Sequence, residues 1–121
     1  MQLKTSTRIS GGTVIIDCSG KIVFGDETAY LRQLVKDLLN ESKQVVLNLN
    51  AVNYIDSSGV GTLVGLHMSV ESAGGQLKLA GLTGRVRDVL AITKLGTVFE
   101  TYDTAEEAVA SFQQGKTSAA S

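Results

Sequence analysis

Residues 53–61 read Asn53-Tyr54-Ile55-Asp56-Ser57-Ser58-Gly59-Val60-Gly61, and this stretch predicts a change from an irregular segment to a helix. Aspartate is a favoured N-cap, because its carboxylate accepts hydrogen bonds from the backbone N–H groups of the first turn. With Asp56 as the cap, Ser57 is the first helical residue, and we expect its hydroxyl to be exposed at the rim of the helix. Ser58 follows as the second helical residue and can turn toward the backbone or the sheet.

Two glycines, Gly59 and Gly61, lie in the same first turn, where Ile55 and Val60 have the spacing of a hydrophobic staple. Each glycine inside a helix costs about 1 kcal/mol relative to alanine, so the pair needs a compensating reason. One reason is tight packing of the helix start on the sheet. The other is close approach of a partner's backbone or a nucleotide, which a Cβ would obstruct. We favour the second and expect Gly59→Ala to weaken binding more than folding.

Outward from this stretch, hydrophobic periodicity predicts alternating strands and helices. Ser10-Gly11-Gly12 has the residues of a two-residue hairpin turn, Gly74-Gly75 those of a helix C-cap, and Thr104 with Glu107 those of a capping box. The expected strands cover residues 3–9, 13–19, 45–49, 76–80 and 97–102, with a short extended piece at 22–24. The expected helices cover residues 26–39, 57–73 and 83–93, with a last helix from 104 and an irregular segment at 50–55.

A hairpin followed by alternating helices and strands is an α/β plan, and right-handed crossovers make the later strands parallel. We expect one domain at residues 1–112, in which a mixed sheet of about four to five strands is packed with about four helices. Residues 113–121 are small and polar, which predicts a disordered C-terminal tail.

Composition excludes several classes of function. The 121 residues include 11 Lys and Arg against 12 Asp and Glu, a net charge of -1. Non-specific binding to nucleic acid or to an anionic membrane needs a positive surplus, so neither is expected. The single cysteine, Cys18, cannot form an internal disulfide, which favours a reducing, cytoplasmic location. The N-terminal charges precede no apolar run typical of a signal peptide, and the apolar stretch at 59–70 is too short to span a bilayer.

The sequence motifs of several classes of enzyme fit this chain poorly. The glycines of residues 59–65 resemble a dinucleotide-binding fingerprint only faintly, because that motif starts directly after a strand and precedes an acidic residue. The sequence holds no P-loop pattern. Asp56, Ser57 and His67 are the residue types of a hydrolase triad, but Ser57 and His67 lie about 15 Å apart along one helix. We therefore expect a protein that is not an enzyme and has no catalytic residue, bound cofactor or metal.

The remaining residues with reactive or charged side chains favour structural roles. Cys18 lies in a predicted strand and His67 among apolar helix residues, and packing is the ordinary role of both. The predicted helix at 83–93 and the residue after it carry four charged side chains: Arg85, Arg87, Asp88 and Lys94. These charges favour a solvent-exposed helix face, and contact with a partner is the alternative.

The stretch at 53–61 resembles the signature of bacterial anti-sigma factor antagonists, which are STAS-domain proteins. In that family an acidic residue is followed by Ser, Ser or Thr, Gly, a branched apolar residue and Gly. Three further segments support the resemblance and extend it over nearly the whole chain: Gly20-Lys21-Ile22, Gly74-Gly75-x-Leu77 and Val89-Leu90-x-x-Thr93-x-Leu95. The family implies a STAS fold.

The resemblance also implies a mechanism. Family members bind an anti-sigma factor that is a serine kinase with a GHKL-type ATP site, and they thereby release a sigma factor. The kinase phosphorylates the first serine after the aspartate, here Ser57, which ends binding, and a PP2C-type phosphatase restores the serine. ATP belongs to the kinase and not to this chain. The implied partner-binding residues are Asn53, Asp56, Ser58, Gly59, Val60 and Gly61.

Other roles remain open at this point. Some relatives serve response-regulator phosphatase pathways, and residues 23–27 differ from the corresponding loop of sporulation members, so the partner is not identified. A further class of STAS modules belongs to membrane transport or lipid-trafficking complexes. Those modules often lack the serine pair, so Ser57-Ser58 disfavours that class. Whether the chain dimerises is also left open.

Overall fold

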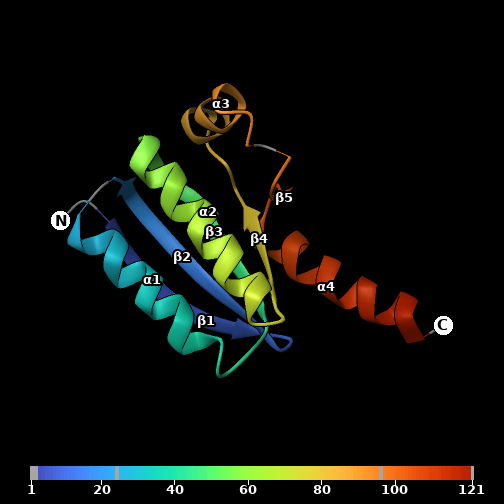
Figure 1. Cartoon of the computed structure of the whole chain (residues 1–121). Helices are drawn as coiled ribbons and strands as arrows, with labels where there is room; N and C mark the ends of the chain where they lie inside the picture. Colours follow the sequence, from blue (N-terminus) through green and yellow to red (C-terminus); the bar gives the residue numbers. More distant parts are fainter. Residues whose placement is uncertain (1–2, 24, 96, 121) are drawn as a thin grey trace.

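Five strands form one sheet in the computed structural model, which describes residues 3–23, 25–95 and 97–120, without the side chains of 26, 27 and 114–120. The strands lie side by side in sequence order (Figure 1). The first pair is antiparallel and the other three pairs are parallel, as the sequence predicts. The strands are β1 (Leu3–Ser10), β2 (Thr13–Ile22), β3 (Gln44–Ile55), β4 (Gln76–Ala80) and β5 (Glu100–Tyr102).

The turn between β1 and β2 has the two residues predicted for it. Gly11 and Gly12 have φ of 56° and 81°, between the paired residues Ser10 and Thr13. Positive φ at both central positions is the geometry of a type I′ turn, whose twist matches that of the flanking strands. The two glycines of the turn therefore determine where the chain reverses to form the hairpin.

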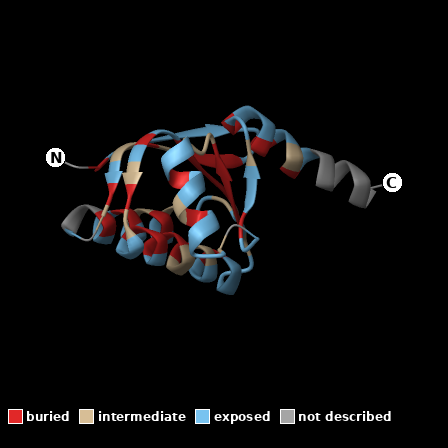
Figure 2. Ribbon diagram, turned by 90° about the horizontal axis from the view of Figure 1, so that it is seen from above, coloured by how far each residue is buried: buried red, intermediate tan, exposed pale blue. Residues whose placement is uncertain are grey.

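The described helices cover the sheet unequally: α1 (Asp26–Leu38), α2 (Ser57–Ser72) and α3 (Gly84–Ile92) lie on one face and α4 (Ala105–Ala120) on the other (Figure 1). Successive strand residues point to opposite faces. Val14 and Ile16 of β2 accordingly join the core under α1–α3, and Ile15 joins the core under α4. The buried residues gather in the central strands and on the helix sides that face them (Figure 2).

A lysine is buried under α4. The Lys78 side chain on β4 is 6% exposed, and its Nζ donates to Ser111 Oγ at 2.6 Å. The same Nζ lies 4.1 Å from the centre of the Phe112 ring, so a cation–π contact adds to the hydrogen bond. The long apolar stem and charged tip of Lys78 thus hold α4 to β4.

Three sequence predictions about strands are wrong. β3 continues through Ile55 instead of becoming irregular after residue 49, because its pairing with β2 continues to Ile55. Residue 22 belongs to β2 rather than to a separate piece at 22–24, of which residue 24 lies outside the described residues. β5 begins at Glu100, since Thr97 and Val98 lie in a turn.

The C-terminal helix extends past the predicted domain boundary. The backbone of α4 is helical through Ala120, whereas the sequence predicts a disordered tail from residue 113. The side chains beyond Gln113 and residue 121 lie outside the described part, so the division into a domain at 1–112 and a tail stays a prediction. Within the described residues, the length and apolar character required of a membrane-spanning helix occur in none of the helices.

Candidate functional site

The first turn of α2 is anchored as the sequence predicts. Asp56 has an extended backbone and is the N-cap, and its Oδ1 accepts a hydrogen bond from the Gly59 backbone N–H at 2.7 Å. Ile55 and Val60 flank the cap and are 1% and 3% exposed within the same core cluster. This burial agrees with the predicted hydrophobic staple. The helix start therefore combines a polar cap with two buried apolar side chains.

Both serines of the motif are exposed. Ser57 is the first helical residue and faces solvent, as predicted. Ser58, which as the second helical residue could turn toward the backbone or the sheet, is exposed and lines a groove of about 380 Å³ between α1 and α2. Both residues belong to the first turn of the helix, where the backbone dipole favours negative charge.

The two glycines of the first turn have different structural reasons. A Cβ on Gly59 would overlap the backbone carbonyl oxygen of Ile22 and come 2.7 Å from Ile55 Cγ1. The expectation that Gly59 leaves room for a partner is therefore wrong, since tight packing explains this glycine. At Gly61, a Cβ would have no described atom within 4 Å. Gly61 opens into the groove that Ser58 lines.

Only some of the six predicted partner-binding residues are accessible to a partner. Asn53, Ser58 and Gly61 are exposed and Asp56 is half-buried, all near the end of β3 and the start of α2. The other two, Gly59 and Val60, are buried. The accessible residues thus lie within four residues of Ser57 in the sequence, and the buried ones belong to the packed side of the turn.

An arginine that the sequence patterns do not single out also lines this groove. Arg32 of α1 lines it opposite Ser58, and its Nη2 donates to Thr62 Oγ1 at 3.4 Å. The Thr62 hydroxyl in turn donates to the Ser58 carbonyl at 3.0 Å. No sequence signal places Arg32 here, because the contact depends on how α1 and α2 pack on the sheet.

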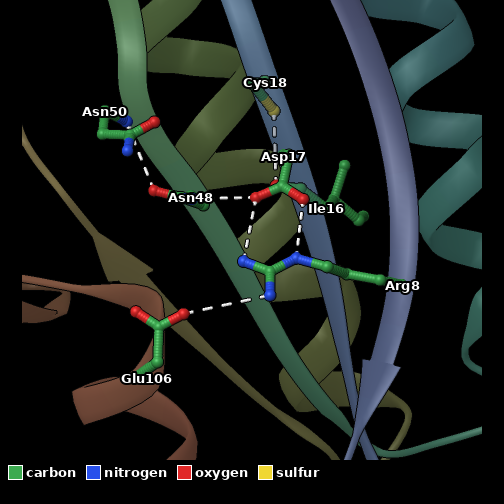
Figure 3. A network of polar contacts seen from close by, with 7 residues as sticks. All are labelled: Arg8, Ile16, Asp17, Cys18, Asn48, Asn50 and Glu106. Atoms are coloured by element: carbon green, nitrogen blue, oxygen red, sulfur yellow. Dashed lines mark hydrogen bonds and ion pairs between the residues drawn. The ribbon is translucent and has the colours of Figure 1, made fainter.

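A second polar cluster, which no sequence pattern indicates either, lies on the α4 face of the sheet (Figure 3). The Asp17 carboxylate accepts hydrogen bonds from Arg8 Nε at 2.8 Å and from Asn48 Nδ2 at 2.8 Å. Asn48 Oδ1 accepts from the Asn50 backbone N–H at 3.3 Å, and Arg8 Nη1 lies 3.9 Å from a Glu106 oxygen.

The Arg8 hydrogen bond, assisted by that of Asn48, lowers the pKa of Asp17, whereas partial burial opposes this shift. The Asp17 hydrogen bond and charge raise the pKa of Arg8 in return. The ion pair therefore links β1 to β2 while both side chains are charged. The side chains of Arg8, Asp17 and Asn48 are hydrogen-bonded to one another, which marks the cluster as a structural network.

The groups with intrinsic reactivity are placed for packing. Burial raises the pKa of the Cys18 thiol to about 12, so the thiol is protonated at neutral pH and a poor nucleophile. The His67 ring stacks edge-on against Phe99 with centroids 5.5 Å apart. Among the residues described, no group of three or more His, Cys, Asp and Glu side chains is arranged to hold a metal ion.

Comparison with known proteins identifies similar sequences. The model of the STAS domain family matches residues 4–108. A Thermotoga neapolitana protein, named as a candidate anti-sigma factor antagonist, is 36% identical over 90 residues, which are 72% of this chain and 80% of that protein. The anti-sigma-B factor antagonist of Bacillus subtilis is 33% identical over 70 residues, covering 58% of this chain and 64% of the relative.

Solved structures with the same fold come from two kinds of protein. The anti-sigma factor antagonist SpoIIAA in its unphosphorylated form superposes with a TM-score of 0.76 at 22% identity, over 92% of this chain and 97% of SpoIIAA. A sulfate transporter family protein from Wolinella succinogenes gives a TM-score of 0.77 at 22% identity, over 88% and 89% of the two chains. At this identity the likeness concerns the fold alone.

Proposed function

Because the chain belongs to the STAS domain family, we propose that it is an anti-sigma factor antagonist whose binding is ended by phosphorylation of Ser57. The observation that carries the proposal is the exposed Ser57 at the start of α2, directly after the Asp56 cap. The names of the relatives from Thermotoga neapolitana and Bacillus subtilis support the general role. In this role the chain is a regulatory binding protein of the cytoplasm and not an enzyme.

In the proposed mechanism the partner is an anti-sigma factor that is also a GHKL-type serine kinase. Unphosphorylated chain binds this partner and releases the sigma factor. Asn53, Ser58 and Gly61 are exposed close to Ser57 in the sequence and supply accessible contacts to the partner. The kinase binds the ATP and transfers its γ-phosphoryl group to Ser57 Oγ, with release of ADP, and a PP2C-type phosphatase hydrolyses the phosphoserine.

The switch follows from the local electrostatics of the helix start. A phosphoserine adds about -1.5 to -2 charges at neutral pH. The helix dipole favours such a group by about 0.3–1 kcal/mol when it is exposed, and the Asp56 carboxylate offsets part of this gain. The fold is therefore retained. A partner surface shaped for a hydroxyl must instead accommodate and desolvate a dianion, which weakens the complex.

Phosphate mapping tests this proposal. The purified chain is incubated with ATP and the kinase-like anti-sigma factor of its own host, and mass spectrometry locates the phosphate. We expect phosphate on Ser57, full labelling of Ser58→Ala and no labelling of Ser57→Ala. Labelling of Ser57→Ala at the wild-type level would contradict the proposal.

The fold likeness to the Wolinella transporter family protein supports a second candidate, a STAS module that regulates a transport or lipid-trafficking complex. In a variant of the first proposal, the partner of the antagonist belongs to a response-regulator phosphatase pathway. The exposed pair Ser57 and Ser58 favours the kinase-switched antagonist, because STAS modules of the transport class often lack this pair. Absence of any phosphate on α2 together with binding to a transport protein would favour the second candidate.

A further inference from the structure

Two cationic side chains converge on the ring of Tyr54 near the end of β3. Arg85 Cζ lies 4.7 Å from the ring centre and Lys21 Nζ lies 5.9 Å from it. Lys21 is the register partner of Tyr54 on β2, and Arg85 is the second residue of α3. Three elements therefore bring their side chains together into one cluster, which we call the Tyr54 cluster.

Among the described side chains, no carboxylate forms an ion pair with either cation of the Tyr54 cluster. Among the side chains described, the ion pairs use Arg8 and Lys78, and neither Lys21 nor Arg85 forms an ion pair or a hydrogen bond. The Asp56 carboxylate, close by in the sequence, is used in the helix cap. Both cations are exposed, so an external anion can reach them.

The Tyr54 cluster adjoins the turn that presents Ser57. Tyr54 precedes the Asp56 cap by two residues in the same chain segment. Lys21 precedes Ile22, whose carbonyl packs against Gly59 and accepts a hydrogen bond from the Asp56 backbone N–H at 3.4 Å. A protein that covers Ser57 is therefore close to the cluster as well.

The residue types of the cluster suit a protein partner with carboxylates. Tyrosine and arginine are enriched at protein interfaces and at their energetic centres. A guanidinium stacked on an aromatic ring keeps its in-plane N–H groups free for a bidentate contact with a carboxylate. Nucleic acid requires an extended basic surface, and this chain has a net charge of -1.

We propose that Lys21, Tyr54 and Arg85 form a docking surface for a carboxylate-bearing segment of the protein partner that covers Ser57. The identity of that partner as the anti-sigma factor rests on the function proposed above. Docking neutralises two positive charges that the fold holds together, and it fixes the partner's register relative to Ser57. The cluster thus contributes specificity for an acidic partner segment.

A peptide titration tests the surface without the partner. A hexaglutamate peptide is titrated into the ¹⁵N-labelled full chain, and chemical shifts are followed by NMR. The test variant is Lys21→Glu/Arg85→Glu, and the control is Lys36→Glu/Arg87→Glu, which makes the same change in net charge at other exposed sites. We expect wild-type shifts centred on residues 21, 54 and 85, an affinity loss of about fivefold in the test variant and below about twofold in the control. Equal losses in both variants, or shifts centred elsewhere, would overturn the inference.

Calorimetry with the host's kinase-like anti-sigma factor separates this inference from the proposed function. If wild type binds that protein and the test variant binds it equally well, the docking surface is wrong and the antagonist function stands. If wild type does not bind it, the proposed function fails and the peptide titration alone decides the inference. Circular dichroism melting of each variant confirms that the loss of affinity comes from a folded protein. Tyr54→Phe keeps the ring and should retain both affinities.

Discussion

The backbone carbonyl oxygen of Ile22 occupies the space that a Cβ atom on Gly59 would need. This contact joins the end of β2 directly to the first turn of α2. The Asp56 backbone N–H donates to the same carbonyl at 3.4 Å, so one peptide group of β2 positions both the cap and the turn. The exposed Ser57 is thereby held on a rigid support.

The two glycines of this turn should respond oppositely to alanine. Gly59→Ala forces the helix away from Ile22, and overpacking of this kind costs about 1–3 kcal/mol. Gly61→Ala meets no described atom within 4 Å and should gain up to about 1 kcal/mol of helix propensity. Thermal unfolding of the two variants measures the difference. A Gly59→Ala protein that melts at or above the wild-type temperature would contradict the packing explanation.

The helix cap should make a measurable contribution to stability. Asp56→Ala removes the acceptor of the Gly59 N–H and is expected to lower the free energy of unfolding by about 0.5–2 kcal/mol. Asp56→Asn keeps an oxygen acceptor without the charge and is the matched control. Urea denaturation distinguishes them. An equal loss in both variants would show that the charge, and not the hydrogen bond, provides the stabilisation.

How much of this site the sequence predicts depends on whether the signal is local. The hairpin glycines and the Asp56 cap were predicted because each interacts within a few residues of itself. The role of Gly59 was predicted wrongly, since its packing partner Ile22 comes from another strand. The course of β3 was missed for a similar reason.

Polar residues such as Asn50 and Asn53 are typical of a loop, yet they belong to β3. Both residues lie at register shifts of the parallel pairing with β2, between Asp17 and Ser19 and between Gly20 and Lys21, and the paired residues on either side continue the strand. The groove contact of Arg32 and the Tyr54 cluster likewise depend on elements that meet only in the folded chain. Contacts of this kind leave no periodic signal in the sequence.

The ion pair of Arg8 and Asp17 should make stability dependent on pH at the acid end. The folded-state pKa of Asp17 is lowered, so its contribution is complete above the unfolded pKa of about 3.9 and is lost as the pH falls through the folded pKa. Urea unfolding between about pH 7 and pH 2 should show a shallower acid loss for Asp17→Asn than for wild type. Asp88→Asn, at an exposed position on α3, is the control. Identical acid slopes for wild type and Asp17→Asn would contradict the assignment.

A negative charge at Ser57 should leave the fold intact. In Ser57→Asp the helix dipole favours the new carboxylate and Asp56 repels it, so the free energy of unfolding should change by less than about 1 kcal/mol. Circular dichroism and thermal melting check this directly. Loss of the cooperative melting transition would mean that modification acts by unfolding the domain.

Affinity for the host's kinase-like anti-sigma factor, measured by calorimetry with unmodified and Ser57-phosphorylated chain, tests the central claim most directly. The account predicts that phosphorylation raises the dissociation constant by about tenfold or more, a loss of at least about 1.4 kcal/mol, while the melting curve is retained. Equal affinity of the two forms would contradict it.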